Sequence, residues 1–176
     1  MYEPKDIDVG FVIITPENNP RHVEITVSSI SAKYKDKPFV TIVTDAIIDQ
    51  TMSEISRIGK VFLAKNTYSS LLSIGMKNAP AEWNMIVISG TQLRNQAHRK
   101  YSCFIDSPKD ILFPIVDRKM NFVDGTVNGI FVHKNVYSEL GDMPDTPNLN
   151  ECKAAWGSLA VANGYKFKGI VGAALC

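Results

Sequence analysis

Short apolar runs alternate along the first half of the chain with stretches in which apolar residues recur at helical spacing. The apolar runs cover residues 11–14, 39–43, 61–64 and 85–88. A run that is apolar at every position is typical of a strand covered on both faces, and its alternation with helical stretches is typical of βαβ units. The pattern predicts a mainly parallel sheet in which residues 85–88 form a central strand.

The stretch after Pro20 fits two patterns. Val23, Val27 and Ile30 recur at helical spacing, but Val23, Ile25 and Val27 also alternate as they would in a strand. Because a crossover must connect the first two parallel strands, we expect a helix here.

Two further helices are expected in this half. One is expected over residues 48–58, where Ile48, Met52, Ile55 and Ile58 share a helical face; Thr51 and Glu54 have the spacing of a capping box. The other covers residues 71–79. Its candidate N-caps are Thr67, Ser69 and Ser70.

The second half is less regular. Pro114 interrupts the apolar run 112–116 and indicates a sheet edge or an irregular strand. Residues 122–123 and 127–132 are predicted to form antiparallel or mixed strands, and residues 170–175 a last strand.

A regular helix is expected near the end of the chain. Its apolar residues have helical spacing: Cys152, Ala155, Trp156, Leu159 and Ala160. We expect Trp156, Leu159 and Ala160 to lie in the core. The segment 141–150 before it is rich in Pro, Asp and Asn, which predicts a mobile surface loop.

Composition narrows the class of protein. The 176 residues are 45% hydrophobic and 21% charged, as in an ordinary globular domain, and we expect one domain over residues 1–176. The net charge is +1 with basic and acidic residues interspersed, which argues against a nucleic-acid partner.

The sequence also bears on location. No apolar run is long enough for a membrane span and no signal peptide is visible, so a cytoplasmic location is expected. The oligomeric state stays open, a homo-oligomer included.

Several common nucleotide and hydrolase motifs are absent from the sequence. No Gly-x-Gly-x-x-Gly follows the first strand, and neither a P-loop nor a Gly-x-Ser-x-Gly occurs. Cys103, Cys152 and Cys176 form no zinc-binding spacing, and we expect reduced thiols.

Other local motifs occur in a recognisable order. Residues 14–21, Ile-Thr-Pro-Glu-Asn-Asn-Pro-Arg, follow the first strand, and Val43-Thr44-Asp45 ends the second. Residues 74–83, 128–141 and 163–166 continue the series. Taken together, these segments resemble inverting A-type glycosyltransferases of the large family-2 group.

The resemblance implies a fold and a reaction. The fold would be a three-layer α/β/α sandwich with a mainly parallel, mixed sheet of the nucleotide-diphospho-sugar transferase (GT-A) type. Residues 1–91 would be its nucleotide-binding half and residues 92–176 its acceptor-side half. The reaction would transfer a sugar from a nucleoside-diphosphate sugar, with a UDP-sugar as the expected donor, to a glycan or other hydroxyl acceptor.

The resemblance also implies site residues. Those expected to contact the nucleotide are Thr15, Pro16, Glu17, Asn18, Asp45, Lys77, Ser89, Gly90 and Thr91. Arg94 could neutralise the diphosphate, although the basic stretch around it also fits a solvated helix face. Glu151 or Asp145 would act as the catalytic base, and Asp142 is a substitute; a helix start also explains Glu151.

One departure from the family concerns the metal. Where the family places Asp-x-Asp to hold Mn²⁺ or Mg²⁺, this chain has Ile88-Ser89-Gly90-Thr91. Hydroxyl groups are poor ligands for these cations, so a metal cofactor lacks its usual carboxylates. Because the metal-binding carboxylates are missing, two alternatives to an active transferase stay open. One is a catalytically inactive relative that binds a nucleotide, glycan or protein, and the other is a structural subunit without a nucleotide site.

Overall fold

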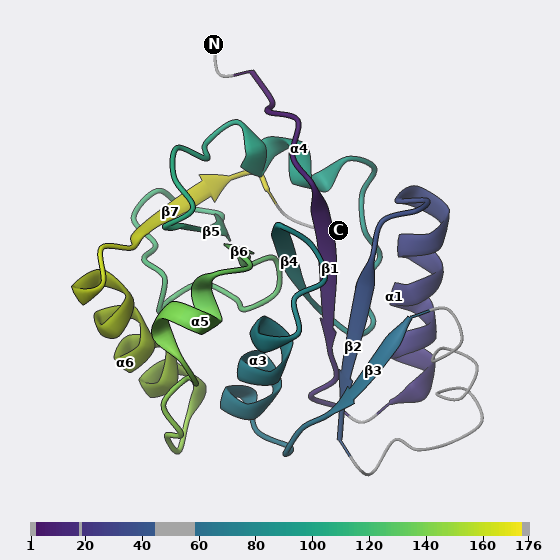
Figure 1. Ribbon diagram of the computed structural model, residues 1–176, viewed down its shortest axis with the longest axis horizontal. Helices are drawn as coiled ribbons and strands as arrows, with labels where there is room; N and C mark the ends of the chain where they lie inside the picture. Colours follow the sequence, from purple (N-terminus) through teal and green to yellow (C-terminus); the bar gives the residue numbers. More distant parts are fainter. Residues whose placement is uncertain (1–2, 18, 45–58, 174–176) are drawn as a thin grey trace.

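The sheet has seven strands in the part of the chain that the computed structural model describes, residues 3–17, 19–44 and 59–173. The strands are β1 (Val9–Ile14), β2 (Phe39–Val43), β3 (Lys60–Leu63), β4 (Trp83–Ile88), β5 (Asp110–Ile115), β6 (Phe131–His133) and β7 (Lys166–Val171). Their order is β3-β2-β1-β4-β6-β5-β7. The first four pair in parallel, β6 is antiparallel to β4 and β5, and β7 is parallel to β5. The sheet is mixed and mainly parallel, as predicted (Figure 1).

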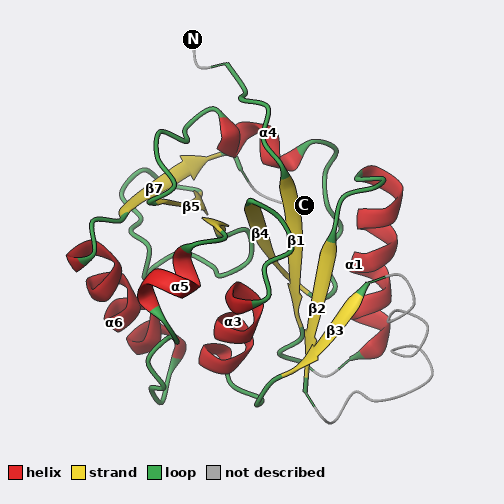
Figure 2. Cartoon of the chain, viewed as in Figure 1, coloured by secondary structure: helices red, strands yellow, loops and turns green. Residues whose placement is uncertain are grey.

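Helices cover both faces of this sheet. One face carries α1 (Pro20–Lys33) and α4 (Ala97–Ser102), and the other carries α3 (Tyr68–Lys77), α5 (Val136–Leu140) and α6 (Leu149–Ala162) (Figure 2). On β1, Phe11 and Ile13 pack in the core under α1, whereas Val12 and Ile14 pack in the core under α3. This alternation confirms the three-layer sandwich and explains why every position of β1 is apolar.

Local signals in the sequence set the helix starts. The stretch after Pro20 is helical, because the Asn19 side chain accepts a hydrogen bond from the Arg21 N–H and proline occupies the first turn. For α3 the N-cap is Thr67, whose side chain accepts from the N–H of Ser70. The helix expected over residues 48–58 lies outside the described residues. No helix in the described ranges is long and apolar enough to cross a membrane.

The second half departs from the predictions in its strands. Strand β5 lies inside the sheet, and Pro114 is tolerated because the β5–β6 ladder is confined to Leu112 opposite Phe131. Phe122 is buried in a turn, so residues 122–123 form no strand, and β6 covers only the end of the predicted 127–132 segment. Strand β7 begins at Lys166, well before the predicted start at residue 170.

The last helix also differs from its predicted packing. Leu159 is 39% exposed, whereas Lys153 is buried and donates hydrogen bonds to the carbonyls of Val123 and Gly125. Burial lowers the pKa of the Lys153 ammonium. Met143, in the segment expected to be a surface loop, is buried, so that segment packs partly against the core.

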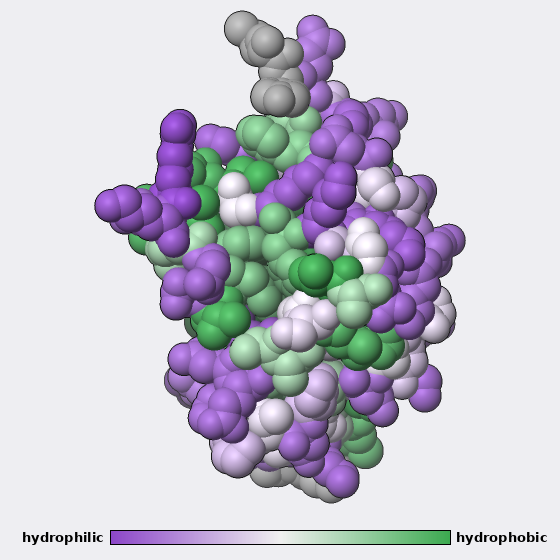
Figure 3. All heavy atoms as spheres, turned by 90° about the vertical axis from the view of Figure 1, so that its left-hand side faces the viewer, coloured by the Kyte–Doolittle hydropathy of each residue, from purple (hydrophilic) through white to green (hydrophobic). Residues whose placement is uncertain are grey.

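Strand β7 forms one edge of the sheet and leaves apolar side chains exposed near it. Val161 of α6 is 61% exposed and Val171 of β7 is 42% exposed. Figure 3 views the molecule from this side and shows hydrophobic side chains gathered across the middle of the face. A hollow of about 680 Å³ lies beside α6, with Phe122 and Phe167 in its lining.

Candidate functional site

The strand order reverses between β1 and β4. Strands β2 and β3 lie on one side of β1, and β4 lies on the other. Open α/β sheets bind their ligands at the carboxyl ends of strands at such a point. Residues 15–17 leave β1 here and residues 89–91 leave β4, and the Ser89 N–H donates to the Ile14 carbonyl at 2.9 Å. The structure thus brings two of the predicted nucleotide-binding segments together.

At the end of β1, the Thr15 side chain joins β1 to β2. Its side chain is fully buried, and Oγ1 donates to the Ile42 carbonyl of β2 at 2.9 Å. Pro16 is half-buried and Glu17 is exposed. The Glu17 carboxylate lies 3.3 Å from Nδ1 of His22 in the first turn of α1. The β1 end therefore presents Pro16, Glu17 and, through Glu17, a histidine. Asn18 and Asp45 lie outside the described residues.

At the end of β4, Gly90 takes a backbone conformation that favours glycine, with φ at +96°. Its N–H donates to the His22 carbonyl and to Oγ1 of Thr26, each at 2.9 Å. The Thr91 N–H is also engaged, by the Ile88 carbonyl at 3.2 Å. All three N–H groups of residues 89–91 are therefore used within the protein, and an anion here must be met by side chains.

Asn128 holds the same turn from the other side. Its Oδ1 accepts from the Ile88 N–H at 2.8 Å, and its Nδ2 donates to Oγ1 of Thr91 at 3.0 Å. The sequence placed Asn128 in an acceptor-side segment, with no sign of this contact. The amide fixes the end of β4 and occupies the Thr91 hydroxyl.

Ser89 has the one side chain of this turn that is left without a partner. The residue is 8% exposed, and its Oγ has no hydrogen bond in the described structure. Ser89 follows the last residue of β4 and lies in the same turn as Gly90. A buried hydroxyl without a partner is costly, and this one lies directly after β4, where the sequence predicts the diphosphate.

The donor set at this turn does not fit a divalent cation. It consists of the Ser89 and Thr91 hydroxyls, and the second is occupied by Asn128. Mn²⁺ and Mg²⁺ require anionic oxygen ligands. Among the residues that the structure describes, no group of three or more His, Cys, Asp or Glu side chains could hold a metal ion.

A second polar region lies at the start of α3. Ser69 Oγ donates to Oδ1 of Asp145 at 3.2 Å, and Ser73 Oγ accepts from the Met143 N–H at 2.8 Å. These bonds attach the segment after α5 to α3. Between them is a hollow of about 250 Å³. Its lining includes Lys65, Thr67, Ser69, Ser70, Asp142 and Asp145.

The candidate bases differ in their surroundings. Asp145 lines the hollow and is held by Ser69. Glu151 is exposed in the first turn of α6, where its N–H donates to the capping Asn148 side chain, and it does not line the hollow. Asp142 accepts a hydrogen bond from the Tyr137 hydroxyl at 2.8 Å, and this bond raises the pKa of Tyr137. Asp145 is the best placed of the three.

Two predicted site residues lie elsewhere. Lys77 is in the last turn of α3, and the Arg94 carbonyl accepts from the hydroxyl of Tyr34, just past the end of α1. Because α1 and α3 run back along the sheet, their carboxyl ends lie at the amino ends of the parallel strands (Figure 1). Lys77 and the backbone of Arg94 therefore lie away from the strand ends where residues 15–17 and 89–91 meet.

Comparisons with known proteins bear on the fold. No family model and no curated protein matches the chain. Residues 1–349 of S. aureus TarS superpose with a TM-score of 0.60 at 16% identity, over 92% of this chain and 57% of that one. The same TarS segment in complex with UDP gives 0.57 at 14% identity, with the same coverage. A further S. aureus TarS structure gives 0.58 at 15%, over 93% of this chain and 35% of that chain.

These neighbours establish the class of fold. They are of the GT-A glycosyltransferase type, and the chain has that fold. It spans little more than half of the TarS segment, 57% of its length. At this level of identity the likeness concerns the fold, and the chemistry of the site rests on the residues described above.

Proposed function

We propose that the chain binds a nucleoside-diphosphate sugar, with UDP as the nucleotide, at the carboxyl ends of β1 and β4. The observation that carries the proposal is the unpartnered Ser89 hydroxyl, buried where these two paired strands end in a GT-A fold. A bound phosphate oxygen would satisfy it after the side chain rotates toward the ligand, because the hydroxyl oxygen itself is not exposed in this structure. The UDP complex of the fold neighbour TarS supports the choice of nucleotide.

The nucleoside would lie over the ends of β1 and β2. Pro16 and Glu17 are exposed or half-exposed there, and Asn18 and Asp45 remain predicted contacts. Thr15 would act indirectly, because its hydroxyl holds β1 to the Ile42 carbonyl. The diphosphate would lie against residues 89–91.

Transfer of the sugar would follow by direct displacement with inversion. The acceptor hydroxyl oxygen forms a bond to the anomeric carbon, and the bond from that carbon to the diphosphate oxygen breaks, leaving its electron pair on UDP. Asp145 takes the proton of the acceptor hydroxyl. Its place in a polar hollow at the start of α3 supports this role. Glu151, being exposed, is the weaker candidate.

Binding without transfer is a second candidate. The feature that favours it is the donor set at residues 89–91, which supplies hydroxyls where the family uses carboxylates. A protein of this kind would keep the nucleotide site and use it to recognise a nucleotide or a sugar.

Release of UDP from a panel of UDP-sugars, with and without hydroxyl acceptors, separates these candidates. For an enzyme we expect UDP release that falls at least tenfold in Asp145→Asn and changes little in Glu151→Gln. UDP binding without release would establish the second candidate. Neither binding nor release would contradict both and leave a structural role.

A further inference from the structure

The turn that replaces the metal motif is covered by a histidine. The His22 ring lies against Gly90: a Cβ on Gly90 would be 3.4 Å from Cγ of the imidazole. The backbones are joined as well, since the Gly90 N–H donates to the His22 carbonyl at 2.9 Å. Residues 22 and 90 are far apart in sequence, so this contact depends on the parallel pairing of β1 with β4.

Glu17 determines which nitrogen of His22 is left for a ligand. The Glu17 carboxylate lies 3.3 Å from Nδ1, and an ionised carboxylate only accepts hydrogen bonds. Nδ1 therefore carries a proton when this bond forms. Nε2 has no partner among the described residues, and the side chain is 36% exposed. A ring protonated on both nitrogens would donate from Nε2 to a phosphate oxygen bound beside it.

The neighbouring groups favour an anion at the same place. The first turn of α1 carries no acidic residue, and the helix has 14 residues, so its positive end adds to the local field. The Ser89 hydroxyl, unpartnered and buried, belongs to the same turn as Gly90. The backbone N–H groups of residues 89–91 are already used. A leaving diphosphate needs positive charge, and His22 is the titratable side chain that contacts this turn.

We propose that His22, oriented by Glu17, binds the diphosphate and neutralises its charge in the place where related enzymes use a divalent cation. This inference rests on the proposed nucleotide site. It makes His22 a residue that touches the ligand and Glu17 a positioning residue. The nucleoside part of the ligand would not contact His22.

The test compares the dissociation constants of UDP and uridine for the whole chain, without added divalent metal. In His22→Gln, the UDP dissociation constant should rise about tenfold or more, since a charge-assisted hydrogen bond is lost. The uridine constant should change less than about twofold. Arg21→Gln is the matched control: it removes a cation from the same helical turn, but Arg21 lines a separate hollow with Glu24 and Ser28. It should leave both constants within about twofold.

The outcomes separate this inference from the proposed function. If the unmodified protein binds UDP and His22→Gln binds it equally well, the inference is wrong and the nucleotide site stands. Equal losses for UDP and uridine would show a structural role and would also overturn it. If the unmodified protein binds neither ligand, the proposed nucleotide site itself is wrong.

A second measurement uses the unmodified protein, so that it does not depend on whether the variant folds. The imidazole ¹⁵N signals of His22 should move toward those of a doubly protonated ring as UDP is added. Signals that do not move would contradict the proposed role of His22.

Discussion

Gly75 of α3 packs directly on Val12 of β1. A Cβ at Gly75 would lie 2.6 Å from Cγ1 of Val12, a side chain that is 1% exposed and branched at Cβ. The contact brings the helix axis close to the sheet at the point where residues 74–83 resemble the family motif. Gly75→Ala should therefore lower the free energy of unfolding by about 1–3 kcal/mol, although alanine is the better helix former.

Gly157 of α6 is the matched control for Gly75. A Cβ there would meet its nearest neighbour, Phe122, at 3.8 Å, which is ordinary contact. Gly157→Ala should raise the free energy of unfolding by about 0.5–1 kcal/mol. Urea denaturation followed by circular dichroism measures both variants. A stabilising Gly75→Ala would show that α3 is not held this closely to β1.

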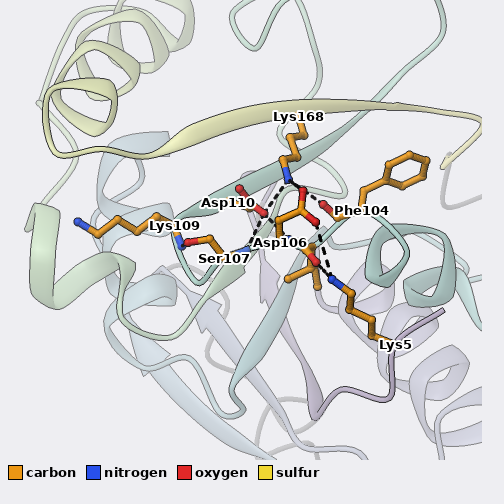
Figure 4. A network of polar contacts seen from close by, with 8 residues as sticks. Lys5, Phe104, Asp106, Ser107, Lys109, Asp110 and Lys168 are labelled. Carbon is orange, nitrogen blue, oxygen red and sulfur yellow. Dashed lines mark hydrogen bonds and ion pairs between the residues drawn. The ribbon is translucent and has the colours of Figure 1, made fainter. Parts of the chain in front are cut away.

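Asp110 joins the start of β5 to β7. Its Oδ2 lies 2.8 Å from Nζ of Lys168 and accepts from the N–H groups of Asp106 and Ser107 (Figure 4). Burial alone would lower the pKa of Lys168, but its hydrogen bonds to Asp106 and Asp110 outweigh burial and raise it. Asp110→Ala leaves two backbone N–H groups without their acceptor and removes the buried carboxylate from the Lys168 ammonium. It should cost about 2–4 kcal/mol of unfolding free energy in urea denaturation.

Asp106→Ala tests whether that cost comes from burial. Asp106 bonds the same Lys168 ammonium at 2.7 Å, but its side chain is 78% exposed. Exposed ion pairs contribute little, so this variant should be clearly less destabilised than Asp110→Ala. Equal losses from the two variants would contradict the account of the Asp110 contact.

The buried Tyr101 hydroxyl should make the free energy of unfolding fall at alkaline pH. Burial raises the pKa of its hydroxyl, which donates to the Gly129 carbonyl at 2.7 Å. The folded state therefore holds the proton more tightly than the unfolded state, whose tyrosine pKa is about 10. This contribution is complete below about pH 10 and is lost as the pH rises toward the folded pKa. Urea midpoints between pH 8 and pH 11 should fall less steeply for Tyr101→Phe than for the unmodified protein. Parallel curves would show that Tyr101 does not titrate differently in the two states.

Ser69 should support the proposed base through one hydrogen bond. Its hydroxyl donates to Asp145 at 3.2 Å and also lies 3.2 Å from Oγ1 of Thr67. If Asp145 is the base, Ser69→Ala should lower kcat several-fold and move the acidic limb of its pH profile, while the UDP dissociation constant stays unchanged. Ser70→Ala is a control on the same turn, since Ser70 Oγ accepts from the Lys65 N–H and makes no contact with Asp145. An unmoved profile in Ser69→Ala would contradict the positioning role.

The sequence predicted the first half of the fold well. Strands β1, β2 and β4 are apolar at nearly every position because helices cover both faces, and that pattern is local. Strand β6 was harder to predict because it has three residues and is defined by its partners β4 and β5. Lys153 was missed in the core because its carbonyl partners come from a distant turn. Lys153 stands at helical spacing from the buried Trp156 and Ala160, and this spacing was the sequence signal that could have placed it in the core.

The sequence predicted the parts of the candidate site that directly follow strand ends. It did not predict the parts that depend on the direction of a helix or on contacts between residues far apart in the chain. Residues 15–17 and 89–91 meet because parallel strands end at one edge. Lys77 lies at the opposite ends of the strands because α3 runs back along the sheet, and the Arg94 backbone lies there because it is bonded to Tyr34, just past the end of α1. His22 was overlooked because its contacts with Glu17 and Gly90 depend on the β1–β4 pairing and on the turn before α1.

Binding of UDP is the most direct test of the nucleotide site between β1 and β4. Thermal unfolding would be followed with UDP, GDP, CDP and dTDP, each with and without Mn²⁺, for the unmodified protein and for Ser89→Ala. A ligand at about 100 times its Kd adds roughly 2.7 kcal/mol, and each kcal/mol shifts the Tm of a domain of this size by about 2–4 °C. We expect a Tm increase of several degrees for UDP, independent of Mn²⁺ and reduced in Ser89→Ala. No shift with any nucleotide, or a shift that Ser89→Ala leaves intact, would contradict a nucleotide site at the ends of β1 and β4.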